Sequence, residues 1–163
     1  MTTPRKNNYA FVDGSNLYLG MRDVGWKLNY KRFRVFLRDR LEVSTAYIFL
    51  GYVPTMQWLY TSLQSWGYQV VLKPTIPLAG GNVKGNCDVD LTLRTMIEFD
   101  NFDGAVLVTA DGDFLVLAQH LDVAGKLERI IAPQPRGCSS LLKKAFPPGK
   151  FLFVDQHRQK LEL

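Results

Sequence analysis

Cysteine and histidine are scarce in this chain, with two of each among its 163 residues. Cys87 and Cys138 stand far apart and without C-x-x-C spacing, so the sequence encodes neither a zinc knuckle nor a disulfide framework. His120 falls within an apolar helical pattern and His157 in a basic tail. Neither histidine is therefore expected to be catalytic, and a reducing compartment suits the two thiols.

Long hydrophobic runs are also missing. No apolar stretch approaches the length of a membrane span, and the first residues, MTTPRKNN, contain no hydrophobic core of a signal peptide. These absences predict a cytoplasmic protein that does not bind a membrane. No repeat, low-complexity tract or linker interrupts the chain, and its apolar content of 47% is enough to fill one core. We expect residues 1–163 to form a single domain.

Positive charge exceeds negative charge by five, and the pI is about 9.3, which suits a polyanionic partner. The excess lies in two stretches. The first contains Lys27, Lys31, Arg32, Arg34, Arg38 and Arg40. The second contains Arg136, Lys143, Lys144, Lys150, Arg158 and Lys160. Both stretches are candidate polyanion surfaces, and a merely solvated basic surface is the alternative.

Short β-branched or aromatic runs alternate with amphipathic stretches, a pattern typical of β-α units around a mainly parallel sheet. The strands are expected at residues 9–13, 45–52, 69–73, 105–109, 127–132 and 151–154. Six such strands predict a doubly wound α/β fold. Sheets of this kind bind ligands where the strand order reverses, and the first strand and the strand at residues 105–109 can be neighbours at that point.

Helices are expected between these strands. Asn29 is the predicted cap of a helix that turns Arg32, Arg34 and Arg38 toward water. The helix that opens at Asp88 is expected to bury a stripe formed by Val89, Leu93, Met96 and Ile97. Residues 74–86, rich in glycine and proline, are predicted to form a loop, and Ser139 is expected to begin the last helix.

Four aspartates carry most of the functional information. Asp13 closes the apolar run YAFV, Asp88 opens a helical pattern, and Asp111 and Asp113 follow the apolar run AVLV. Each also has a structural explanation, as a turn former, a helix cap or an acid at a helix start. Carboxylates that converge at strand ends repel one another, however, and a divalent cation relieves this repulsion. We therefore expect a site for a hard cation.

Three segments resemble the signature segments of NYN domains, particularly of the LabA-like branch, which belongs to the PIN-like nuclease superfamily. They are VDGSNL at residues 12–17, KGNCDVDL at 84–91 and VTADGDF at 108–114. The resemblance extends over residues 9–153 and includes the helix SSLLKKAF. It implies a three-layer α/β sandwich with a central parallel sheet and PIN-like, Rossmann-like topology. It also implies one or two Mg²⁺ or Mn²⁺ ions and the hydrolysis of RNA phosphodiester bonds.

The resemblance assigns roles to individual residues. The metal-binding and catalytic carboxylates are Asp13, Asp88, Asp111 and Asp113. Asn16 is the polar helper beside them, and Thr109 takes a place usually held by a small or hydroxyl residue. Arg94 stands where many relatives have another acid, which argues against a second, tightly held metal.

Contacts with RNA are expected from basic and aromatic side chains. Lys84 and Arg94 flank Asp88 in the sequence and are the first candidates for phosphate contacts, followed by Arg136 and Lys143. In the loop after the first motif, Tyr18 and Trp26 can stack on a base, with core packing as the alternative for both.

Two classes of function are consistent with the sequence. The first is a metal-dependent ribonuclease, and the second is a catalytically weak or inactive NYN-type module that binds RNA. The presence of all four acids favours the enzyme. A Tyr- and Trp-rich surface at residues 52–60 is a candidate homodimer interface.

Overall fold

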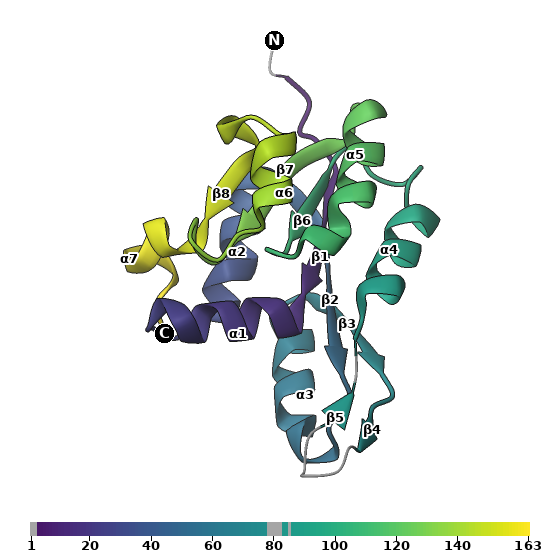
Figure 1. The fold of residues 1–163 in the computed structure, drawn as a ribbon. Coiled ribbons are helices and arrows are strands. Elements are labelled where there is room, and N and C mark those ends of the chain that lie inside the picture. Colours follow the sequence, from purple (N-terminus) through teal and green to yellow (C-terminus); the bar gives the residue numbers. More distant parts are fainter. Residues whose placement is uncertain (1–2, 78–82, 85) are drawn as a thin grey trace.

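The computed structural model describes residues 3–77, 83–84 and 86–163. Six parallel strands form the central sheet in the order β3-β2-β1-β6-β7-β8 (Figure 1). They are β1 Asn8–Asp13, β2 Val43–Gly51, β3 Tyr68–Lys73, β6 Ala105–Val108, β7 Leu127–Ala132 and β8 Phe151–Phe153. The predicted α/β fold and all six predicted strands are confirmed.

Helices cover both faces of this sheet and so make three layers. The helices are α1 Gly14–Val24, α2 Tyr30–Leu41, α3 Gln57–Ser65, α4 Asp88–Ile97, α5 Leu115–Val123, α6 Ser140–Ala145 and α7 Arg158–Leu161. Short 3-10 turns lie at η1 Pro54–Met56, η2 Gly112–Phe114, η3 Pro148–Lys150 and η4 Val154–His157. Among the described helices, none combines the length and apolar character that crossing a membrane requires.

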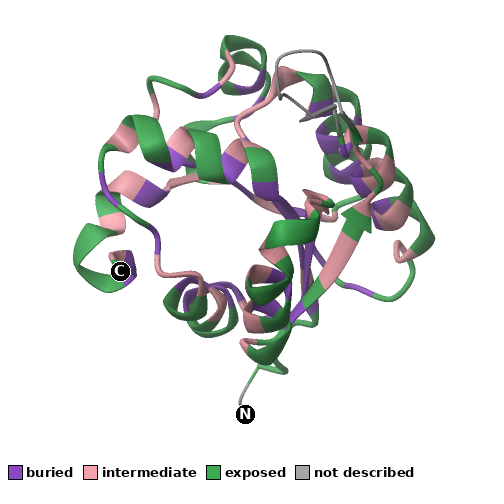
Figure 2. Ribbon diagram, turned by 90° about the horizontal axis from the view of Figure 1, so that it is seen from below, coloured by how far each residue is buried: buried purple, intermediate pink, exposed green. Residues whose placement is uncertain are grey.

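Two apolar cores lie on opposite sides of the sheet because side chains alternate along each strand. From β1, Val12 packs with α1, α2, α3 and α7, whereas Phe11 packs with α4, α5 and α6. The strand β6 is buried along its whole length. This burial explains its uninterrupted apolar sequence, since a parallel strand covered on both faces has no polar side. In Figure 2 the buried segments follow the strands and the inward sides of the helices.

Several local predictions hold and others need correction. Asn29 caps α2, as predicted, by accepting a hydrogen bond from the Arg32 amide at 3.0 Å, and Ser139 caps α6. Residues 14–24, however, form α1 rather than a loop, and α7 follows α6. The region predicted as a loop contains a short antiparallel pair, β4 Ile76–Pro77 and β5 Val83–Lys84.

The predicted buried face of α4 is wrong. Val89 is 74% exposed and Leu93 is 59% exposed, while Leu91 and Thr95 are buried against the sheet. Both pairs follow helical spacing, so periodicity alone does not tell which stripe is covered. The fold covers the stripe of Leu91, and the more apolar stripe is left in contact with solvent.

Arg34 also departs from its predicted orientation toward water. It is half-buried, and its guanidinium donates hydrogen bonds to the carbonyls of Val43, Ser44 and Gly67 at 3.3, 3.0 and 3.2 Å. Burial lowers the pKa of this arginine. Arg34 therefore joins α2 to the start of β2 and to the turn before β3, and is unavailable to a polyanion.

Gly14, the first residue of α1, has no room for a side chain. A Cβ atom there would lie 2.4 Å from Leu50 Cδ2 and 2.8 Å from the Phe49 carbonyl oxygen. We predict that Gly14→Ala lowers the free energy of unfolding by about 1–3 kcal/mol through overpacking. Urea unfolding measures the change. Gly149→Ala is the control because its Cβ would meet nothing within 4 Å, and equal effects of the two substitutions would contradict the prediction.

Candidate metal centre

The candidate site lies where the strand order reverses. The chain builds β2 and β3 on one side of β1 and then returns through α4 to place β6 on its other side. Val12 pairs with Val108, so the residues that follow, Asp13 and Thr109, emerge at the same edge of the sheet. The predicted adjacency of these two strands is confirmed. This edge is the usual ligand-binding position in doubly wound sheets.

Asp13 forms the buried floor of the site. Its side chain is the cap of α1 and accepts hydrogen bonds from the Asn16 amide at 3.4 Å and the Thr109 hydroxyl at 3.3 Å. Burial raises the pKa of Asp13 to about 6, against the opposing effect of the Asn16 amide and with the help of the negative charges of Asp88 and Asp111. Asp13 therefore caps α1, and its burial makes the ionised form of its carboxyl unfavourable.

Asp111 and Asp113 are held by a tight turn after β6. Asp111 caps η2 by accepting a hydrogen bond from the Asp113 amide at 2.8 Å, and its own amide donates to the Thr109 hydroxyl at 3.1 Å. Between the two acids, Gly112 packs closely on the loop before α6, because a Cβ there would lie 2.5 Å from Ser139 Oγ. The turn thus caps η2 and fixes the positions of the Asp111 and Asp113 carboxylates.

Asn16 connects the first motif to this turn. Its side-chain oxygen accepts a hydrogen bond from the Ala110 amide at 2.9 Å. On the other side, the Ala110 carbonyl accepts from the Ser139 amide at 3.0 Å. Asn16 therefore fixes the acidic turn relative to α1, and its role as a polar helper in the site stays a prediction.

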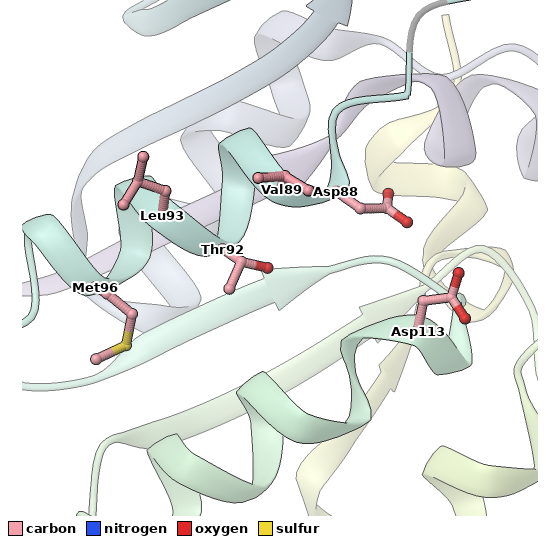
Figure 3. Close-up of a pocket in the computed structure, with 6 residues that line it drawn as sticks. All are labelled: Asp88, Val89, Thr92, Leu93, Met96 and Asp113. Atoms are coloured by element: carbon pink, nitrogen blue, oxygen red, sulfur yellow. The ribbon is translucent and has the colours of Figure 1, made fainter.

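Asp88 completes the cluster from the first turn of α4. One carboxylate oxygen from each of Asp88, Asp111 and Asp113 lies within 4.8 Å of the others. Figure 3 shows the side chains of Asp88 and Asp113 approaching each other from α4 and η2. Partial burial raises the pKa of Asp88, and the charges of Asp111 and Asp113 raise it further. Three crowded oxygen donors suit a hard divalent cation such as Mg²⁺ or Mn²⁺.

Within the described part of the chain, the group that can share one cation consists of these three acids, and Asp13 lies beside it rather than in it. Asp13 is nonetheless near enough for the charges of Asp88 and Asp111 to shift its pKa. The donor chemistry therefore fits the implied metal, with three clustered carboxylate oxygens and the buried Asp13 carboxyl beside them.

Comparison with known proteins identifies the family. The sequence model of the NYN domain matches residues 9–154, nearly the whole chain. This chain belongs to the NYN domain family. Membership places it in the PIN-like nuclease superfamily and confirms the predicted resemblance.

Two relatives illustrate the range of this similarity. The NYN domain is 26% identical over 114 residues to the low amplitude and bright protein LabA of Synechococcus elongatus. That match covers 64% of this chain and 61% of LabA. This chain is also 26% identical to a protein of unknown function from Vibrio parahaemolyticus. The crystal structure of that protein superposes on it with a TM-score of 0.78 over 100% of both chains. The LabA-like branch and the fold are both supported.

Lys73 is a neighbour of the site that the sequence did not reveal. It ends β3 and forms an ion pair with Asp90 at 2.9 Å. Its positive charge partly opposes the rise in the pKa of Asp88 that burial and the neighbouring acids cause. The available signal was its place at the end of an expected strand, on the edge where ligands bind.

The basic residues predicted to contact RNA have different environments in the NYN domain. Arg94 lies over the ring of Tyr47, 5.5 Å from its centroid, and 3.9 Å from Glu98, so it is engaged on another side of α4. Arg136 is exposed in the loop after β7, and Lys143 donates to the Pro135 carbonyl at 3.0 Å. The side chain of Lys84 lies outside the described residues.

The two aromatic residues predicted to stack on a base differ in their exposure. Tyr18 is 62% exposed on α1, whereas Trp26 is buried in the core, so packing is the correct explanation for Trp26. On the surface predicted for a dimer, Tyr52 and Trp58 are exposed, but Tyr60 is buried. The homodimer stays a prediction.

The raised pKa of Asp13 makes stability depend on pH in metal-free protein. Below its unfolded pKa of about 4 the carboxyl is neutral in both states. Between about pH 4 and pH 6 it ionises mainly in the unfolded state, so the folded state loses stability as the pH rises through this window. We predict that Asp13→Asn, which can still cap α1, raises the free energy of unfolding by about 1–3 kcal/mol at pH 7.5. Denaturant unfolding in EDTA measures this gain, and a gain that does not shrink toward pH 4 would refute the assignment.

Metal binding should depend on the three clustered acids. We predict that Asp111→Asn weakens Mn²⁺ binding by more than about tenfold. Substitutions of residues that only hydrogen-bond to a metal ligand commonly cost about tenfold in affinity, and loss of a ligand should cost more. Isothermal titration calorimetry provides the measurement. Asp100→Asn is the matched control because Asp100 is an exposed acid just beyond α4. Equal affinities of the two variants would place the metal elsewhere.

Proposed function

We propose that this NYN domain is a metal-dependent ribonuclease that hydrolyses RNA phosphodiester bonds at the Asp88, Asp111 and Asp113 cluster. The supporting observation is the approach of three carboxylate oxygens within 4.8 Å at the reversal point of the sheet. A divalent cation bound there supplies Lewis acidity toward water and the phosphate. The family supports nuclease chemistry, and the donor set supports Mg²⁺ or Mn²⁺ as the cofactor.

The protein contributes a fixed arrangement of charges to this reaction. Asp88, Asp111 and Asp113 would hold the cation, and Asp13, which accepts a hydrogen bond from the Thr109 hydroxyl, would add a negative charge beside them. Asn16 keeps the acidic turn in register with α1 through its bond to the Ala110 amide. Preorganisation of this kind lowers the cost of assembling the site during the reaction.

RNA is the proposed substrate because the chain is basic and the family acts on RNA. Arg136 is the best placed of the proposed phosphate contacts. It is exposed in the loop between β7 and α6, and that loop reaches the acidic turn through the bond from Ser139 to Ala110. Lys143, in the following helix, is a second proposed contact. Lys84 is proposed from its place in the sequence only, and Arg94 is displaced toward Tyr47.

Cleavage of a labelled single-stranded RNA tests the proposal. We predict cleavage with Mn²⁺ or Mg²⁺, none with EDTA, and a loss of at least about 100-fold in rate for Asp13→Asn and Asp111→Asn. Asp100→Asn should retain full activity, and melting temperatures show whether each variant is folded. Activity that survives in both site variants would point to a contaminant. Salt-dependent binding without cleavage under any divalent cation would establish the binding-module alternative.

A further inference from the structure

A groove of about 440 Å³ leads from the acidic cluster along α4. Its lining consists of Asp88, Val89, Thr92, Leu93, Met96 and Asp113. Figure 3 shows the two acids together at one end, with the other side chains following along α4. The groove is open to solvent and is continuous with the candidate metal centre.

The apolar side of this groove is unusually exposed. Val89, Leu93 and Met96 are 74%, 59% and 38% exposed, although they repeat at helical spacing. Scattered apolar side chains are normal on a surface, but these three form one stripe that begins at the acidic cluster. Because the opposite stripe of α4 already covers the sheet, this stripe is free to meet a ligand.

The charge of the groove decides which part of RNA fits. Its described lining contains two carboxylates and no lysine or arginine, so it repels phosphate beyond the point where a cation neutralises the acids. The flat, largely apolar face of a nucleobase has no such conflict. Thr92 adds a hydroxyl that can donate to or accept from a base edge. The groove thus complements a base and the cluster complements the adjoining phosphate.

We propose that the α4 groove receives the nucleobase next to the phosphate bound at the acidic cluster. The inference rests on the proposed nuclease function and adds a base-binding site to it. A base can enter the groove only when it is unstacked from its neighbours, which costs least in single strands. Duplex RNA keeps its bases inside and presents only its backbone.

The test compares Leu93→Ser with Ile97→Ser. Both residues are exposed apolar side chains on α4, at 59% and 58%, but only Leu93 lines the groove. Fluorescence anisotropy in Ca²⁺ measures the binding of a single-stranded octanucleotide. We predict about tenfold weaker binding for Leu93→Ser, the scale of one lost base contact, and no change for Ile97→Ser. Binding of duplex RNA should be the same in all three proteins.

A second set of probes locates the base. In this set, each octanucleotide lacks the base at a different position. We predict that one of them binds wild type about tenfold more weakly than the intact octanucleotide does. Leu93→Ser should bind this probe and the intact octanucleotide with equal affinity, because the variant has already lost the contact between Leu93 and the base. Equal affinity of the two serine variants, or a further loss for Leu93→Ser at every position, would overturn the proposal. Dissociation of a wild-type dimer by Leu93→Ser, seen by light scattering, would instead make the stripe a protein interface.

The two proposals fail in different ways. If Leu93 and one base are coupled but wild type cleaves no RNA, the groove proposal stands and the nuclease proposal does not. If wild type cleaves RNA and no coupling exists, only the groove proposal is wrong. Wild type that binds no RNA contradicts the groove proposal directly. Unchanged melting temperatures confirm that both serine variants are folded.

Discussion

Repulsion among carboxylates at one edge of the sheet is the constraint on which the site depends. Asp88, Asp111 and Asp113 bring their oxygens together, and Asp13 lies buried beside them. Burial first, and the neighbouring negative charges second, raise the pKa of Asp13 and of Asp88, so ionising these acids carries an energetic cost in the metal-free protein. Such a cost is common at functional sites, and a cation relieves it. The basic surface elsewhere attracts a polyanion, but this cluster is where chemistry can occur.

The surrounding fold prevents the acids from moving apart. The turn after β6 is tied to α1 through Asn16 and to the α6 cap through Ser139, while Gly14 and Gly112 allow close approach of neighbouring segments. The helix α4 supplies Asp88 from its first turn and packs on the sheet through only one stripe. A single short helix therefore provides a candidate metal ligand, covers a core, and leaves an apolar groove beside the candidate metal centre.

Much of the fold followed from the sequence because its strands are locally distinct. The apolar runs that form β1 and β6 are buried on both faces, so composition alone locates them. The helix α1 was missed since it begins Gly-Ser-Asn and contains Gly20, where a Cβ would lie 2.3 Å from Pro133. Its glycines allow tight packing but have low helix propensity, so propensity alone does not predict this helix.

The sequence by itself determined the strands, their order in the chain and the four acids, because each is marked by residue type and local spacing. Only the tertiary structure decided which acids lie close enough to share a cation, that Arg34 bonds to backbone carbonyls, and that Lys73 reaches Asp90. It also decided that the more apolar stripe of α4 faces solvent. These features depend on how distant elements meet, and helical spacing or charge along one segment carries no information about that meeting.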